Sequence, residues 1–194
     1  VFLIALLLTT LTQIWLAARH IRYVRAHQDK VPEKFASQIN LADHQKAANY
    51  TCAKTRAGYA GILLQVVLLL VFTLGGGLNA LSNFWANWLS DPLMHGMALI
   101  ISTFMIIGIA EIPLSYYRTF VIEEQYGFNK MTPGMFFTDL IKQSVLGLLL
   151  GAPLLFGVLW LMERMGESWW LYAWLAWIAF NLIVLAIYPT WIAP

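Results

Sequence analysis

Long apolar runs separated by polar connections dominate the chain. A helix that rises about 1.5 Å per residue needs about 20 apolar residues to cross a hydrocarbon core of about 30 Å. Five runs meet this length, and they are Val1–Ala18, Gly58–Leu81, Leu93–Leu114, Gln143–Met162 and Trp169–Tyr188. The pattern predicts an all-α, polytopic membrane protein with five transmembrane helices. A soluble helical protein would not need so many runs of this length.

Two features of the chain ends bear on this prediction. The first run has no basic residues before it and no small-residue cleavage site, so it is interpreted as a span rather than a signal peptide. The chain lacks an initial Met and stops at Pro194 directly after an apolar segment. We therefore expect it to be a piece of a longer protein.

The composition agrees with a membrane protein and excludes several site types. Charged residues make up 11% of the chain, against about 25% in a soluble domain, and the mean hydropathy is +0.67. Cys52 is the only cysteine, so the chain can form neither an internal disulfide nor a zinc site built from cysteines.

The basic residues predict the orientation in the membrane. The first connection, 19–57, holds eight Lys and Arg against three Asp and Glu, whereas Ser82–Pro92 holds only Asp91. Since basic loops stay in the cytoplasm, the first connection, the third connection (Ser115–Phe137) and the C-terminus are predicted to be cytoplasmic. The basic residues favour attraction to anionic lipid headgroups over nucleic-acid binding.

The first connection is predicted to be helical in part. Pro32 suits the first turn of a helix. Asn40 is a candidate N-cap, and the helix that starts at Leu41 meets no Pro or Gly before Gly58, so it should run unbroken into the second span. The glycines at 75–77 suggest a frayed end to that span. Trp85 and Trp88 are among the tryptophans near span ends, which fit interfacial belts.

Charged side chains at membrane depth are few, and Glu111 is the main one. Such a carboxylate usually faces protein, the interface or a water-filled cavity. Arg118 lies seven residues later, about two helical turns, and is a candidate partner if the helix continues that far. We treat Glu111 and Arg118 as intramembrane polar candidates without a catalytic role.

The third connection is unusually polar and aromatic for its surroundings. It reads FVIEEQYGFNKMTPGMFF over residues 120–137. Glu123 and Glu124 point about 100° apart on a helix, so structural salt bridges are favoured over an acid–base pair. Gly127 predicts a turn, and Thr132 with Pro133 predicts a helix start.

Three stretches of the chain together resemble one family. They are FVIEEQYGFNKMT followed by FFTDLIK, then VPEKFASQINLADHQKAANYTCAKTRAGY, and LYAWLAWIAFNLIVLAIYPTWIAP. Taken in their order along the chain, they resemble the type I CAAX prenyl proteases, which are integral-membrane zinc metalloproteases, and bacterial members more than eukaryotic ones. The resemblance implies a seven-helix enzyme around a water-filled chamber, with zinc held by an HExxH helix and a further Glu. It also implies the bacterial inner membrane and peptide or membrane-protein substrates.

The chain departs from that family at the metal site. Its four histidines, His20, His27, His44 and His95, open no HExxH motif. No zinc ligand can be assigned, so we expect the catalytic zinc domain beyond residue 194 and an inactive fragment that forms the chamber wall. Glu123, Glu124, Asn129 and Lys130 are a candidate latch that docks the membrane domain onto its own C-terminal catalytic domain, and a purely local loop fold is the alternative.

Two other functions fit the same five spans. A transporter-like bundle is disfavoured because the spans carry few ionisable groups beyond Glu111. A non-catalytic membrane scaffold describes the chain by itself. An HExxH motif downstream of Pro194 would favour the protease over both.

Overall fold

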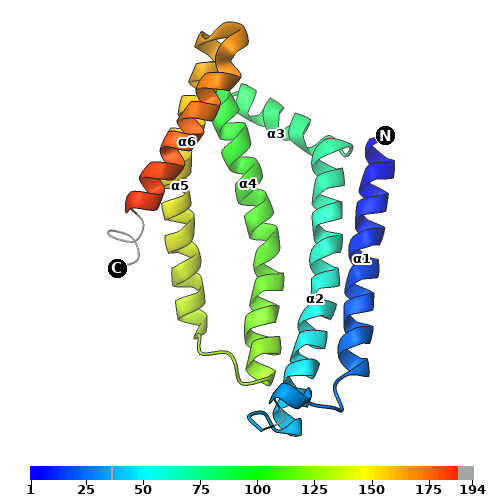
Figure 1. Cartoon of the computed structure of the whole chain (residues 1–194). Helices are drawn as coiled ribbons and strands as arrows, with labels where there is room; N and C mark the ends of the chain where they lie inside the picture. Colours follow the sequence, from blue (N-terminus) through cyan, green and yellow to red (C-terminus); the bar gives the residue numbers. More distant parts are fainter. Residues whose placement is uncertain (36, 188–194) are drawn as a thin grey trace. The chain divides into compact units, whose positions relative to one another are not determined.

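The computed structural model describes residues 1–35 and 37–187, and these residues are almost entirely helical (Figure 1). The α-helices are α1 (Phe2–Ala26), α2 (Leu41–Thr73), α3 (Gly77–Ala86), α4 (Pro92–Tyr117), α5 (Pro133–Arg164) and α6 (Trp169–Ile187). The 3₁₀ turns η1 (Glu33–Phe35) and η3 (Gly166–Ser168) precede α2 and α6, and the π-helical η2 (Arg118–Glu123) extends α4. Tyr188 of the predicted fifth span and the tail to Pro194 lie outside the described residues.

The predicted all-α architecture with five membrane spans is confirmed. Among the described residues, five helices are long and apolar enough to cross a membrane: Phe2–Ala26, Leu41–Thr73, Pro92–Glu123, Pro133–Arg164 and Gly166–Ala186. Their apolar side chains point outward, and the buried hydrophobic residues of the described chain are Ile21, Ala48, Cys52, Ile122 and Phe136. Such exposure suits lipid, which solvates apolar side chains as well as a protein core does.

The second span ends earlier than predicted. We expected Gly58–Leu81, but α2 ends at Thr73 and a separate helix, α3, begins at Gly77. Gly76 takes a φ of +75°, a left-handed conformation that interrupts the helical hydrogen-bond ladder between the two helices. The apolar residues at 74–81 therefore lie in the break between the helices and in α3, not in the second span.

The polar helix ends behave as the sequence predicts. Asn40 Oδ1 accepts a hydrogen bond of 2.7 Å from the backbone N–H of Asp43, and α2 runs unbroken from Leu41 past Gly58. Thr132 Oγ1 accepts a hydrogen bond of 3.2 Å from the N–H of Met135 at the start of α5. Both caps satisfy amides that have no partner within their helix.

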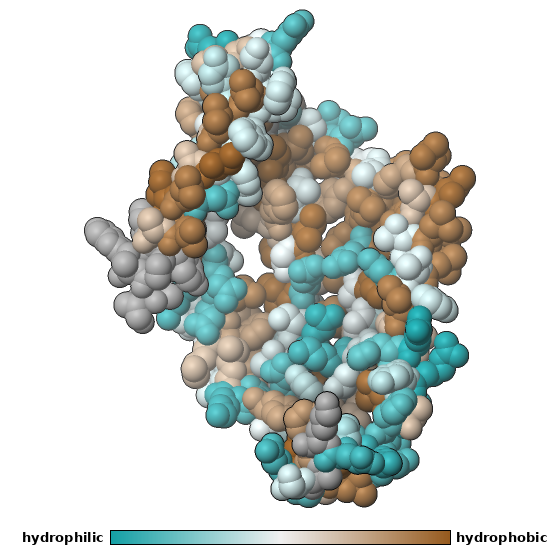
Figure 2. All heavy atoms as spheres, viewed as in Figure 1, coloured by the Kyte–Doolittle hydropathy of each residue, from teal (hydrophilic) through white to brown (hydrophobic). Residues whose placement is uncertain are grey.

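The chain forms two compact units. The first comprises Val1–Gly77 and Ile106–Met131, in which α1 packs against α2 and η2 also contacts α2. The second comprises Leu78–Met105 and the chain from Thr132 onward, in which α5 packs against α6. On the visible face of the first unit, hydrophilic residues gather where α1 ends and α2 begins (Figure 2).

Hydroxyl groups within the spans bond back to their own helices. Thr10 Oγ1 donates to the carbonyl of Leu6 and Thr12 Oγ1 to that of Leu8, both at 2.7 Å. Thr103 Oγ1 does the same to Leu99 at 2.7 Å. These bonds satisfy the hydroxyls without water or a second helix.

We predict that Thr132→Ala lowers the free energy of unfolding by about 1 kcal/mol, because it removes the N-cap of α5. The midpoint of thermal unfolding in mild detergent should fall by about 2–4 °C. Thr138→Ala is the matched control on the same helix, since Thr138 is exposed and donates only to the Gly134 carbonyl four residues before it. Equal midpoints for the two variants would contradict the capping role.

Candidate functional site

The polar stretch after α4 folds into a compact loop around one carbonyl. The carbonyl of Glu123 accepts hydrogen bonds from the N–H groups of Phe128 and Asn129, at 2.8 and 3.2 Å. Gly127 has a φ of +74°, which a residue with a Cβ rarely adopts, so the predicted turn is confirmed. These bonds close the loop that follows η2.

Asn129 closes this loop with its side chain. Its Nδ2 donates to Glu124 Oε2 at 2.9 Å, and its Oδ1 accepts from the N–H of Met131 at 2.7 Å. The amide is half-buried and uses both of its ends. A carboxylate acceptor makes the first of these bonds charge-assisted and hence stronger than a neutral one.

Aromatic rings hold the loop against the start of α2. The Tyr50 ring meets those of Tyr126 and Phe128 edge to face, with centroids 5.5 and 4.8 Å apart. Lys46 Nζ lies over the Phe128 ring at 5.5 Å from its centroid. Such edge-to-face and cation–π contacts each contribute about 0.5–1.5 kcal/mol beyond area burial. The loop is therefore anchored to α2 as well as closed on itself.

The structure brings together some of the predicted latch residues and leaves one apart. Glu123, Glu124 and Asn129 meet in the loop, whereas Lys130 is exposed and has no hydrogen bond or ion pair among the described residues. The salt bridges expected for the two glutamates are also absent there, since the ion pair found in the described chain joins Asp139 to Lys142. Glu124 instead accepts from a neutral amide.

Arg118 lies where α4 passes into the π-helix and packs against α2. A Cβ placed on Gly61 would lie 3.0 Å from Arg118 Nη2 and 3.3 Å from Leu114 Cδ2, so the missing side chain admits the guanidinium. Arg118 Nε is buried without a hydrogen-bond partner. Because the guanidinium lies over Gly61, it does not pair with Glu111, which is exposed two turns earlier.

Sequence reasoning missed the α2 side of this site. Lys46, Tyr50 and Lys54 follow one another at four-residue spacing, which places them on one helical face, and Gly58 and Gly61 follow on the same helix. The four-residue spacing indicates that these side chains share one face of α2. It does not indicate that this face contacts the loop after η2.

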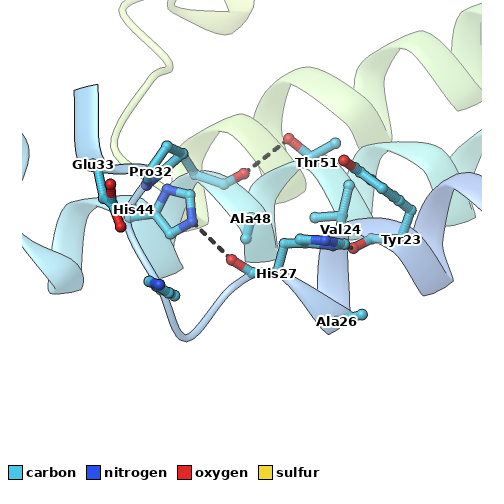
Figure 3. Close-up of a pocket in the computed structure, with 11 residues that line it drawn as sticks. Tyr23, Val24, Ala26, His27, Pro32, Glu33, His44, Ala48 and Thr51 are labelled. Carbon is cyan, nitrogen blue, oxygen red and sulfur yellow. Dashed lines mark hydrogen bonds between the residues drawn. The ribbon is translucent and has the colours of Figure 1, made fainter. Parts of the chain in front are cut away.

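A cavity of about 930 Å³ with a mostly apolar lining lies between the end of α1, the η1 turn and the start of α2 (Figure 3). His44 Nε2 donates to the carbonyl of His27 at 3.1 Å, and His27 Nδ1 donates to that of Tyr23 at 2.8 Å. Lys30 and Glu33 add one charge of each sign to the lining. The two imidazoles thus stabilise the end of α1 and the connection between α1 and α2.

The described residues do not offer a metal site. No group of three or more His, Cys, Asp or Glu side chains in 1–35 and 37–187 lies close enough to hold a metal ion. The side chains in these ranges therefore form no set that fits the zinc that the family resemblance implies.

Comparison with known proteins gives one family. Residues 20–194 match the family described as "CAAX prenyl protease N-terminal, five membrane helices". The chain is 33% identical over 175 residues to a CAAX prenyl protease 1 homolog of Caenorhabditis elegans, covering 89% of this chain and 39% of that protein. It is 31% identical over 173 residues to the homolog of Dictyostelium discoideum, covering 85% of this chain and 40% of that protein.

A solved structure has the same fold. The crystal structure of S. mikatae Ste24p superposes with a TM-score of 0.87 at 22% identity, covering 97% of this chain and 45% of that one. The chain thus spans about two fifths of the length of the curated relatives that it matches.

We predict that Gly61→Leu destabilises the first unit by about 1–3 kcal/mol, because the new side chain must displace Arg118 and Leu114 from α2. Gly58→Leu is the matched control, since a Cβ at Gly58 meets nothing within 4 Å. The control should be neutral or stabilising, because Leu favours a helix more than Gly does. Thermal unfolding of both variants in detergent measures the difference, and an equal loss in both would refute the close approach of Arg118.

Proposed function

The chain belongs to the CAAX prenyl protease N-terminal family with five membrane helices, and from this we propose that it is the membrane-embedded N-terminal part of a zinc metalloendopeptidase. The observation that carries the proposal is the match of residues 20–194 to that family, together with the five membrane helices of the structure. The full-length enzyme would cleave peptides or membrane proteins, and this part would form the wall of the chamber that admits them.

In the proposed enzyme, the zinc ligands come from another part of the full-length protein. The chain covers 39–40% of the length of the two relatives described above, and we propose that the zinc ligands belong to a catalytic domain in the remaining part of the full-length protein. Zinc bound there would supply a polarised water for peptide hydrolysis. The residues of this chain would hold that domain in the membrane and exclude lipid from the substrate path, and the chain alone would be inactive.

The protein is an integral membrane protein, and we propose its orientation from its charges. The basic residues of the first connection that the structure describes with side chains, such as Arg19, Arg22 and Arg25, are exposed. Exposed basic residues next to a span favour the cytoplasmic side, which would also hold the third connection and the C-terminus. The bacterial inner membrane stays a prediction from the resemblance, since the relatives described above are eukaryotic.

We further propose that the loop after η2 docks the catalytic domain, with Lys130 as its outward contact. Glu123, Glu124 and Asn129 give the loop its fixed shape through the Glu123 carbonyl and the Asn129 amide. Lys130 follows directly and is exposed, so its ammonium is available to a carboxylate of the catalytic domain. In this arrangement three of the four predicted latch residues shape the loop and the fourth makes the contact.

We predict that purified full-length protein contains zinc and cleaves a peptide ending in a prenylated CAAX sequence. A zinc chelator should abolish the cleavage and added zinc should restore it, as followed by mass spectrometry of the products. The fragment 1–194, purified in parallel, should bind no zinc. A zinc-free full-length protein, or cleavage that survives the chelator, would refute the metalloprotease assignment.

We predict that Lys130→Ala in the full-length protein lowers the rate of peptide cleavage about threefold with an unchanged unfolding temperature, because a partly exposed ion pair contributes about 0.5–1 kcal/mol. Asn129→Ala should lower both quantities, since it removes two hydrogen bonds that shape the loop. Lys142→Ala, at a lysine that is 75% exposed, is the control and should change neither. An unchanged cleavage rate in Lys130→Ala would remove the docking role and leave a purely local loop.

A further inference from the structure

The short helix α3 has two distinct faces. At about 100° per residue, Leu81, Phe84, Trp85 and Trp88 fall on one side, and Asn79, Asn83 and Asn87 fall on the other. The turn continues past Ala86, because the N–H groups of Trp88 and Leu89 both donate to the carbonyl of Trp85. This division between apolar and polar residues is typical of a helix that lies at a boundary between two solvents.

Two side-chain contacts fasten α3 to the first three turns of α4. His95 Nε2 donates to the carbonyl of Ser82 at 3.0 Å, and Trp85 Nε1 donates to Ser102 Oγ at 3.0 Å. In Figure 1, one end of α3 lies near the beginning of α4, and α3 runs away from it at a steep angle rather than parallel to it. Since α4 is a membrane span, a helix fixed at a steep angle to it lies close to the membrane plane.

The contacts with α4 leave part of the apolar face uncovered. Trp85 and Leu81 are half-buried, but Phe84 is 53% and Trp88 is 75% exposed, and Leu78 beside them is 38% exposed. The three asparagines are exposed on the opposite face. The uncovered apolar side chains therefore point away from the residues that favour water.

We propose that α3 is an interfacial helix, with Phe84, Trp88 and Leu78 inserted between the headgroups and acyl chains of the bilayer and Asn79, Asn83 and Asn87 facing water. Tryptophan is enriched at this depth because its ring is both apolar and able to donate a hydrogen bond. The helix is held at this surface by the spans that precede and follow it in the chain, α2 and α4.

The partner is the uncharged part of the interface rather than anionic lipid. The sequence holds no Lys or Arg between Arg56 and Arg118, and the one charge near α3 is Asp91. Attraction to anionic headgroups requires basic residues. Insertion of α3 therefore depends on its apolar side chains alone, in contrast to the basic first connection.

A second copy of the chain is a poorer fit to this face. A stable protein interface buries about 1,200–2,000 Å² in total. A helix of ten residues is about 15 Å long and offers three exposed apolar side chains, of which the largest bury about 150–250 Å² each. A bilayer sets no such minimum area, because the spans already hold the helix against it.

The test is a depth measurement by spin labelling in the full-length protein, with its native cysteines replaced and reconstituted in phosphatidylcholine vesicles. Labels are placed one at a time through Phe84→Cys, Trp88→Cys, Asn83→Cys and Asn87→Cys. Collision with oxygen, which concentrates in lipid, is compared with collision with a water-soluble nickel chelate. Phe104→Cys, at a position of α4 that is 70% exposed, gives the lipid reference.

We expect labels at positions 84 and 88 to collide more with oxygen, as at 104, and labels at 83 and 87 to collide more with nickel. Adding phosphatidylglycerol should leave this pattern unchanged. Equal nickel access at all four positions would overturn the proposal, as would protection of 84 and 88 from both reagents, which would indicate a protein partner. If a label prevents reconstitution, Leu78→Cys and Asn79→Cys provide the same comparison one turn earlier.

Discussion

The absence of water from the hydrocarbon core constrains this structure more than any single contact does. A peptide group that leaves water must find its hydrogen bond within the chain, and a lone helix is the simplest element that satisfies all of its peptide groups. Side chains are then free to face lipid, which explains why so few described residues are buried. Polar side chains that bond to backbone amides are found where helices begin, at Asn40 and Thr132, and the loop after η2 is closed by Asn129.

The same constraint decides what the sequence can predict. Length and hydropathy locate the spans because crossing lipid requires both, and Asn40 and Thr132 are recognisable because capping depends on the few residues nearest to them. The end of α2 was misplaced because apolar residues continue on both sides of the glycines at 75–77, although the left-handed conformation of Gly76 ends the helix. The contact between Gly61 and Arg118 joins residues 57 positions apart, and no local pattern specifies it.

The candidate site shows how a charged segment can serve shape rather than chemistry. Glu123 and Glu124 look like catalytic carboxylates in isolation, but the structure uses the carbonyl of the first and the side chain of the second to close a loop. Tyr50 and Lys46 then hold that loop on α2. A rigid loop between a span and the next helix offers a fixed surface to a neighbouring domain. This is the property that a membrane part needs if catalysis is performed elsewhere in the protein.

The hydroxyls of Thr10 and Thr12 have a consequence for the first span. Each hydroxyl donates to a carbonyl of its own helix, so its hydrogen bond is satisfied without water. The methyl group of each threonine is then the part of the side chain that can contact lipid. The carbonyls of Leu6 and Leu8 then serve a hydroxyl in addition to their helical amide. Sharing the carbonyl between two donors weakens its hydrogen bond to the helical amide on that side of α1. The helix can therefore bend at this point without a proline.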